Sequence, residues 1–220
     1  MLFVWLFLYG AVMLLATMAT PWFTYAETAA LAGYTLALVI WIVTSGRRKA
    51  SGFGQVASGG WKKHLFFVPY LLPVFYNLFR FGFSVPAWTD ILLILSAAAL
   101  EEIVFRGFLV RKIRPQGLGI LLSTIAFALA HLVNLENGSQ LLPVICQVLF
   151  ALAVGFALSG LSLSCGSVFP CIAIHFFINI TAGSGIAVYK DPLFWVCAAG
   201  CIGCGIYSTY KNHASKQDVP

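Results

Sequence analysis

The chain has 220 residues, of which 60% are hydrophobic and 9% are charged, and its mean hydropathy is +0.92. Soluble domains carry about 25% charged residues, so this composition excludes a soluble domain and indicates an integral membrane protein. The formal net charge of +6 could suggest a nucleic-acid partner. The basic residues lie between hydrophobic runs, however, where membrane proteins place them, and we expect no nucleic acid.

Eight hydrophobic runs approach or reach the roughly 20 mostly apolar residues that a bilayer crossing requires. They cover about residues 1–20, 29–44, 64–81, 88–113, 117–133, 142–163, 168–181 and 192–210. The seventh run is short, so the sequence leaves open whether it spans fully. In lipid every backbone polar group must be satisfied inside the protein, and helices achieve this. The sequence therefore predicts an all-α, polytopic membrane bundle of about eight transmembrane helices, forming one membrane domain over residues 1–220.

Basic residues gather on one side of this predicted bundle. Most of the 13 Lys and Arg fall in the linker 47–63, in the segment 111–114 and in the tail 211–216. An even number of crossings places these three segments and both termini on the same side of the bilayer. By the positive-inside rule that side is the cytoplasm, so we expect a multi-pass protein with cytoplasmic termini.

The fourth run, which contains LEEIVFRGFL, holds Glu101, Glu102 and Arg106. A charge at the middle of a spanning helix costs from about 2.5 to over 10 kcal/mol, so such residues are rare and usually functional. Glu102 and Arg106 are four residues apart and can pair on one helix face. Glu101 lies about 100° round the helix and lacks that partner. It is therefore the candidate proton acceptor.

Later runs add imidazole and amide groups. FALAH contains Phe127 and His131, and HFFIN contains His175 and Asn179, each pair four residues apart. At 1.5 Å per residue, Glu101 and His175 both come out about 10 Å above the basic side of the bilayer core, and His131 about 20 Å. The helix lengths thus permit a cluster, provided that the fifth helix tilts or begins below the hydrocarbon core. The other strongly polar residues within the runs are Asn77, Asp90 and Gln147.

The chemistry that fits this set is hydrolysis. A carboxylate can take a proton from water, an imidazole can hold or donate one, and an amide can donate a hydrogen bond to an oxyanion. Alternatively, Glu101, His131 and His175 could be three ligands of Zn²⁺ with water in the open position, although HExxH is absent. The sequence does not separate these mechanisms, so the cofactor is unknown, with a divalent metal such as zinc as the candidate.

In that order and on separate runs, the patterns EExxxR, FxxxH and HxxxN resemble the CPBP family of intramembrane proteases. This family includes the CAAX prenyl endopeptidases and bacteriocin-immunity members. The resemblance covers about residues 100–179. It implies an intramembrane endopeptidase with a catalytic core at about residues 88–181. The implied substrate is a peptide or membrane protein, with lipidated substrates among the candidates.

The resemblance also implies a role for each motif residue. Glu101 activates water with help from His131, and His175 and Asn179 stabilise the transition state. Glu102, Arg106 and Phe127 support the site, the first two as a structural pair.

Other functions remain open at this point. Intramembrane acids and histidines also form proton relays, so the chain could be a proton-coupled transporter. Transporters more often show related halves, and the sequence shows none. The chain could also be a non-proteolytic immunity or regulatory membrane protein. For Glu101 and Glu102 in particular, the alternative is an ion-pair cluster that only fixes helix packing.

Overall fold

The computed structural model describes residues 8, 11–12, 15, 18–19, 25–53, 68–136, 139–182 and 188–217, with side chains up to residue 212. Most of the first predicted run, residues 1–20, lies outside these residues. The elements are α2 (Ala26–Thr44), η2 (Val68–Leu71), α3 (Leu72–Phe81), α4 (Trp88–Glu102), η3 (Ile103–Leu109), α5 (Val110–Lys112), α6 (Gln116–Ala130), α7 (Val133–Glu136), α8 (Leu141–Cys165), α9 (Phe169–Thr181), η4 (Val188–Lys190) and α10 (Pro192–Gln217). Within the described residues there is no strand, which confirms the predicted all-α class.

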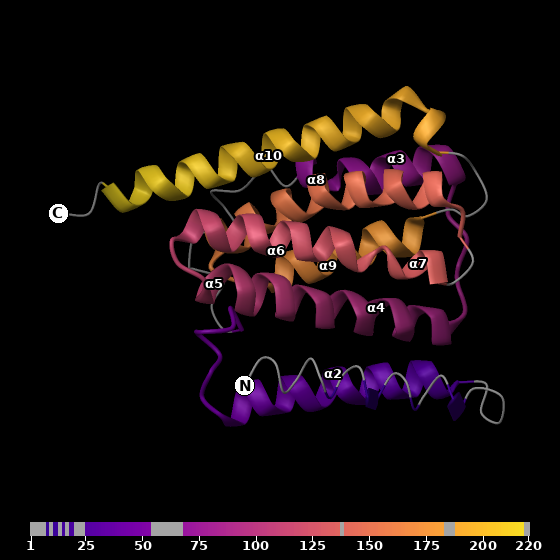
Figure 1. Ribbon diagram of the computed structural model, residues 1–220, viewed down its shortest axis with the longest axis horizontal. Coiled ribbons are helices and arrows are strands. Elements are labelled where there is room, and N and C mark those ends of the chain that lie inside the picture. The colour runs from indigo at the N-terminus through magenta and orange to yellow at the C-terminus, as the bar shows by residue number, and fades with distance from the viewer. Residues whose placement is uncertain are drawn as a thin grey trace.

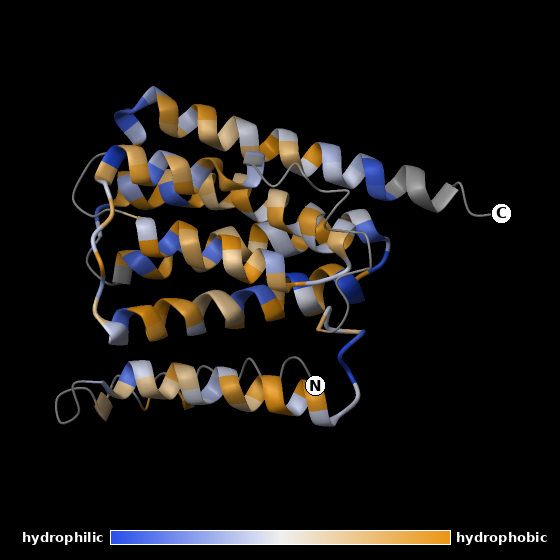
Figure 2. Ribbon diagram, turned by 180° about the vertical axis from the view of Figure 1, so that it is seen from behind, coloured by the Kyte–Doolittle hydropathy of each residue, from blue (hydrophilic) through white to orange (hydrophobic). Residues whose placement is uncertain are grey.

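The long helices lie side by side with similar axis directions, and α2 and α10 form the two outer edges (Figure 1). Helix α8 packs against α6 and α10, α4 packs against α9, and α2 packs against α4. Apolar residues cover the middle of the helices, while hydrophilic residues concentrate at the two ends of the bundle (Figure 2). This distribution is the one expected of a protein whose helix ends meet water on both sides of a membrane.

Within the part of the chain that the structure describes, four helical segments are long and apolar enough to cross a membrane: Ala26–Thr44, Gln116–Leu135, Leu141–Cys165 and Pro192–Asn212. Helix α9 has 13 residues, about 20 Å at 1.5 Å per residue, and is too short to cross a core ~30 Å thick. The predicted helical membrane bundle is confirmed. The eight crossings and the cytoplasmic termini stay predictions.

Elements α4, η3 and α5 follow one another without a break from Trp88 to Lys112, as the single run 88–113 predicted. The middle element, η3, is a π-helix, and such segments occur frequently at functional sites. In η3 the carbonyl of Phe105 accepts the Val110 N–H, and it also accepts a hydrogen bond of 2.9 Å from the Ser123 hydroxyl of α6. This second bond ties α6 to the wide turn beside Arg106.

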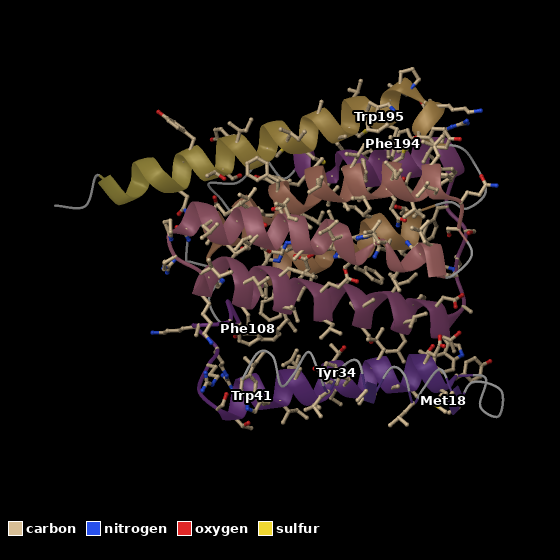
Figure 3. The ribbon with its side chains drawn as sticks, in the orientation of Figure 1. Met18, Tyr34, Trp41, Phe108, Phe194 and Trp195 are labelled. Carbon is tan, nitrogen blue, oxygen red and sulfur yellow. The ribbon has the colours of Figure 1, made fainter. Side chains whose placement is uncertain are left out.

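Helix α2 packs onto α4 through apolar residues spaced three or four apart. Leu31, Tyr34, Leu38 and Ile42 are buried, and a repeat of this kind forms one face of a helix. They join Leu100, Ile103 and Val104 in one core cluster. Tyr34 and Trp41 of α2 are labelled in Figure 3.

Candidate active site

The charged pair predicted within the fourth run forms and is sealed from solvent. Arg106 Nη1 lies 2.7 Å from Glu102 Oε1, and both side chains are 0% exposed. Arg106 Nη2 donates to the carbonyl of Gly155, at 3.3 Å, and the guanidinium carbon lies 4.1 Å from the centre of the Phe127 ring. A Cβ at position 155 would lie 3.0 Å from Phe127 Cδ1 and 3.3 Å from Arg106 Nη2. Glycine on α8 is therefore what lets the arginine and the ring pack side by side.

His175 of α9 joins this pair from a distant part of the chain. Its Nδ1–H donates to Glu102 Oε1 at 2.9 Å, and its Nε2 lies 3.8 Å from Glu101 Oε2. The first distance is a hydrogen bond, whereas the second exceeds the usual range for one. One glutamate thus holds the imidazole and the other faces its second nitrogen.

The two glutamates differ in access. The Glu102 side chain is fully buried, whereas that of Glu101 is 37% exposed. Because only an accessible carboxylate can meet water or a substrate, this difference in exposure favours Glu101 over Glu102 as the candidate proton acceptor. Glu102 is placed to position its neighbours.

His131 comes near the cluster through Phe127. It lies at the end of α6, where its Nδ1–H donates to the carbonyl of Phe127 at 3.0 Å. The Phe127 ring meets the two imidazoles edge to face, with centroid distances of 5.1 Å to His131 and 5.5 Å to His175. The FxxxH spacing therefore places a buried ring between two histidines from different helices.

A cavity of about 180 Å³ lies beside these groups. His131, His175 and Asn179 line it, and Glu101 is not among its lining residues. The Asn179 side chain is exposed. With Phe127, which also lines it, the structure brings four of the predicted site residues to one cavity. His175 both lines this cavity and contacts the glutamates.

The cavity is also lined by residues outside the three sequence motifs. Asn77 donates to the carbonyl of Ile178 at 3.0 Å, and Gln147 accepts a bond of 2.8 Å from Asn134. Polarity inside apolar runs was the available signal for Asn77 and Gln147. Apart from Phe127, the aromatic lining residues carried no such signal; they are Tyr76, Phe81, Phe150 and Phe194.

The three candidate metal ligands do not gather into one cluster. Across the described parts of the chain, no three His, Cys, Asp or Glu side chains come together as ligands. A catalytic zinc takes three protein ligands at about 2.0–2.2 Å. Glu101 Oε2 and His175 Nε2 are 3.8 Å apart, which two ligands of one ion can be, but the structure does not bring His131 to them as the third ligand.

Comparison with known proteins adds one finding. Residues 83–181 match the family described as type II CAAX prenyl endopeptidase Rce1-like. Neither curated proteins nor solved structures gave a match. The matched segment runs from just before α4 to the end of α9, so it contains the buried pair, both histidines and Asn179. Residues 83–181 are therefore similar to the Rce1-like family, and this match supports the predicted resemblance to the CPBP intramembrane proteases.

Proposed function

We propose that this chain cleaves a peptide bond in the membrane with a water molecule activated by Glu101. The observation that carries the proposal is the distance of 3.8 Å between Glu101 Oε2 and His175 Nε2. An accessible carboxylate and an oriented imidazole at this separation can act on the same small group from two sides. The match of residues 83–181 to a protease family supports the same reaction class.

Glu102 orients His175 in this scheme. Its Oε1 accepts the Nδ1–H of His175, which leaves Nε2 as the nitrogen available for chemistry. A buried carboxylate has the same relation to histidine in the Ser-His-Asp triads. Arg106 bonds the same oxygen. In this scheme His175 is protonated, so the positive charges of Arg106 and His175 balance the negative charges of Glu101 and Glu102.

The reaction then follows in two proton transfers. Glu101 removes a proton from water as the oxygen attacks the scissile carbonyl, and the carbon–oxygen double bond becomes an oxyanion. His175 Nε2–H and the Asn179 amide donate hydrogen bonds to that oxyanion, and His131 assists at the cavity side. Glu101 then passes its proton to the leaving nitrogen as the carbon–nitrogen bond breaks. Such oxyanion donors typically contribute about 10²–10³ in rate.

The substrate class follows from the cavity. A space of about 180 Å³ with several aromatic walls accepts one or two apolar side chains of an extended peptide, because whole small-molecule ligands occupy about 300–1,000 Å³. We therefore propose a peptide substrate with an apolar residue next to the scissile bond. Because the matched family is described as a prenyl endopeptidase, a lipidated C-terminal peptide is one of the substrates to be tested.

The experiment compares Glu101→Gln with Asp90→Asn. Both residues lie on α4 and both changes remove one carboxylate, but Asp90 is exposed at the start of the helix. Each protein is reconstituted in vesicles with a library of apolar peptides, with and without a prenylated C-terminal cysteine, and cleavage products are identified by mass spectrometry. Glu101→Gln is expected to lower cleavage by about 10²–10⁴, and Asp90→Asn to leave it unchanged.

Retained cleavage by Glu101→Gln would reject Glu101 as the base. Metal content and chelator sensitivity are measured on the same preparations. The proposed scheme uses no metal, so cleavage should survive chelation, and loss of cleavage that returns with added zinc would overturn it.

A further inference from the structure

A second cavity, of about 310 Å³, lies at the basic end of the bundle, away from the candidate active site. Its cationic lining residues are Arg47, Lys49, Arg111, Lys112 and Arg114. They come from the loop after α2 and from the segment around α5, so residues about 60 positions apart in sequence meet around one space. Figure 2 shows this end of the bundle as hydrophilic.

Acidic side chains lie elsewhere in the described part of the chain. Glu27, Asp90 and Asp191 lie at the opposite ends of the helices. Glu101 and Glu102 lie in the helix interior, about 15 Å from Arg111 at 1.5 Å per residue. Like charges gathered at short range repel one another, and the repulsion is relieved when an anion enters. The cavity is therefore electrostatically suited to a negatively charged ligand.

Arg111 is held rigidly in the wall of this cavity. Its Nη2 donates to the carbonyl of Ser162 at 2.8 Å, and its Nε is buried without a hydrogen-bond partner. The guanidinium lies against Gly52, where a Cβ would come within 2.7 Å of Nε, and Gly52 has a φ of +70°. The N–H of Val168 donates a hydrogen bond of 3.2 Å to the carbonyl of Gly52. Glycine at position 52 thus lets the loop that carries Arg47 and Lys49 close over Arg111.

The cavity has an apolar side as well. Phe108 and Leu163 line it, and the Phe108 ring lies 6.4 Å from that of Trp41 on α2. Figure 3 labels Trp41 on α2 and Phe108 on the neighbouring segment. A free inorganic anion makes no use of such walls, whereas an amphipathic ligand uses both. Basic pockets between membrane helices recognise anionic lipid headgroups in this way.

We infer that this cavity, formed by the loop 47–53, α5 and the start of α6, binds the phosphate group of an anionic phospholipid. The cations hold the phosphate, and Phe108 and Leu163 contact the apolar part of the lipid. The inference is independent of the proposed peptidase activity, because none of these residues takes part in the reaction.

The test measures lipid binding to the purified full-length protein in a neutral detergent. The probe is a fluorescent phosphatidylglycerol, compared with a phosphatidylcholine that carries the same fluorophore, and sodium phosphate is the soluble competitor. Lys112→Gln removes a charge from the cavity, and Lys211→Gln removes one from α10, where Lys211 lies over the Tyr207 ring. A cation near a membrane surface contributes enough to change affinity about fivefold.

We expect phosphatidylglycerol to bind more tightly than phosphatidylcholine and sodium phosphate not to displace it. Lys112→Gln should weaken phosphatidylglycerol binding about fivefold, and Lys211→Gln should leave it unchanged. Equal binding of the two lipids would overturn the inference, as would equal effects of the two substitutions. Displacement of the lipid by sodium phosphate, with the phosphate itself depending on Lys112, would assign the cavity to a soluble phosphate compound instead.

Discussion

Replacement of Arg106 by Met is expected to destabilise the fold strongly. The change removes the 2.7 Å bond to Glu102, the bond to the carbonyl of Gly155 and the cation above the Phe127 ring. Met fills most of the volume of Arg106, so the main effect is that the Glu102 carboxylate stays buried and keeps only its hydrogen bond to His175 among the described residues. Breaking a buried ion pair by removing one partner costs about 3–5 kcal/mol. For a chain of this size that corresponds to a fall in Tm of about 6–20 °C.

The chain supplies its own unfolding reporter. All six cysteines are free and buried, so a fluorogenic maleimide reacts as the protein unfolds on heating in detergent. The matched control is Arg80→Met, because Arg80 forms an exposed pair with Asp191 at 3.4 Å. Exposed pairs contribute about 0–1 kcal/mol, so this control should melt within a few degrees of the unchanged protein.

A double-mutant cycle makes the reasoning refutable. In Glu102→Gln with Arg106→Met the buried charge is gone from both positions, and the loss should be smaller than the sum of the two single losses by about 0.5–3 kcal/mol. Strict additivity would show that Glu102 and Arg106 do not interact as the structure has them. Equal melting of Arg106→Met and Arg80→Met would refute the argument in full.

Three further outcomes are expected. Asn179→Ala should lower the cleavage rate about 10²–10³-fold with unchanged Tm, since its side chain is exposed; an unchanged rate would remove it from the oxyanion scheme. Gly155→Ala should lower Tm, because the new Cβ meets Phe127 Cδ1 at 3.0 Å; a thermal melt equal to that of the unchanged protein would show that the ring yields freely. Gly107→Ala places a Cβ 2.7 Å from the carbonyl oxygen of Ser51, so limited proteolysis should cut the loop 47–53 faster, and an unchanged digestion rate would contradict that contact.

The sequence predicted what depends on local spacing. Glu102 and Arg106 are one helical turn apart, so their pairing follows from the helix alone, and the structure confirms it. The long runs predicted α6 and α8 to within three residues at each end, because twenty apolar residues in succession leave few other conformations in a membrane. They also predicted where α4 and α10 begin, but α10 continues to Gln217, seven residues beyond the predicted run.

Contacts between helices could not be predicted in this way. The bond between His175 and Glu102 joins positions 73 apart, and no periodicity within either helix specifies which neighbour it meets. For the same reason, the sequence did not predict the contacts of Arg106 with the Phe127 ring and with the carbonyl of Gly155. The sequence also gave no sign of the π-helix, because its residues have the same apolar pattern as the α-helix around them.

The π-helix also sets the angle between side chains before and after it on the continuous helical segment 88–112. A π-turn closes with i→i+5 bonds and contains more residues than an α-turn, so loss of one residue between Ile103 and Leu109 would let the segment close as α-helix. Everything beyond that point would then rotate by about 100°, and Arg111 would swing away from the carbonyl of Ser162. Glu101, the proposed base, and Arg111, in the wall of the cationic cavity, both lie on this segment, and the π-turn between them sets the angle at which they point.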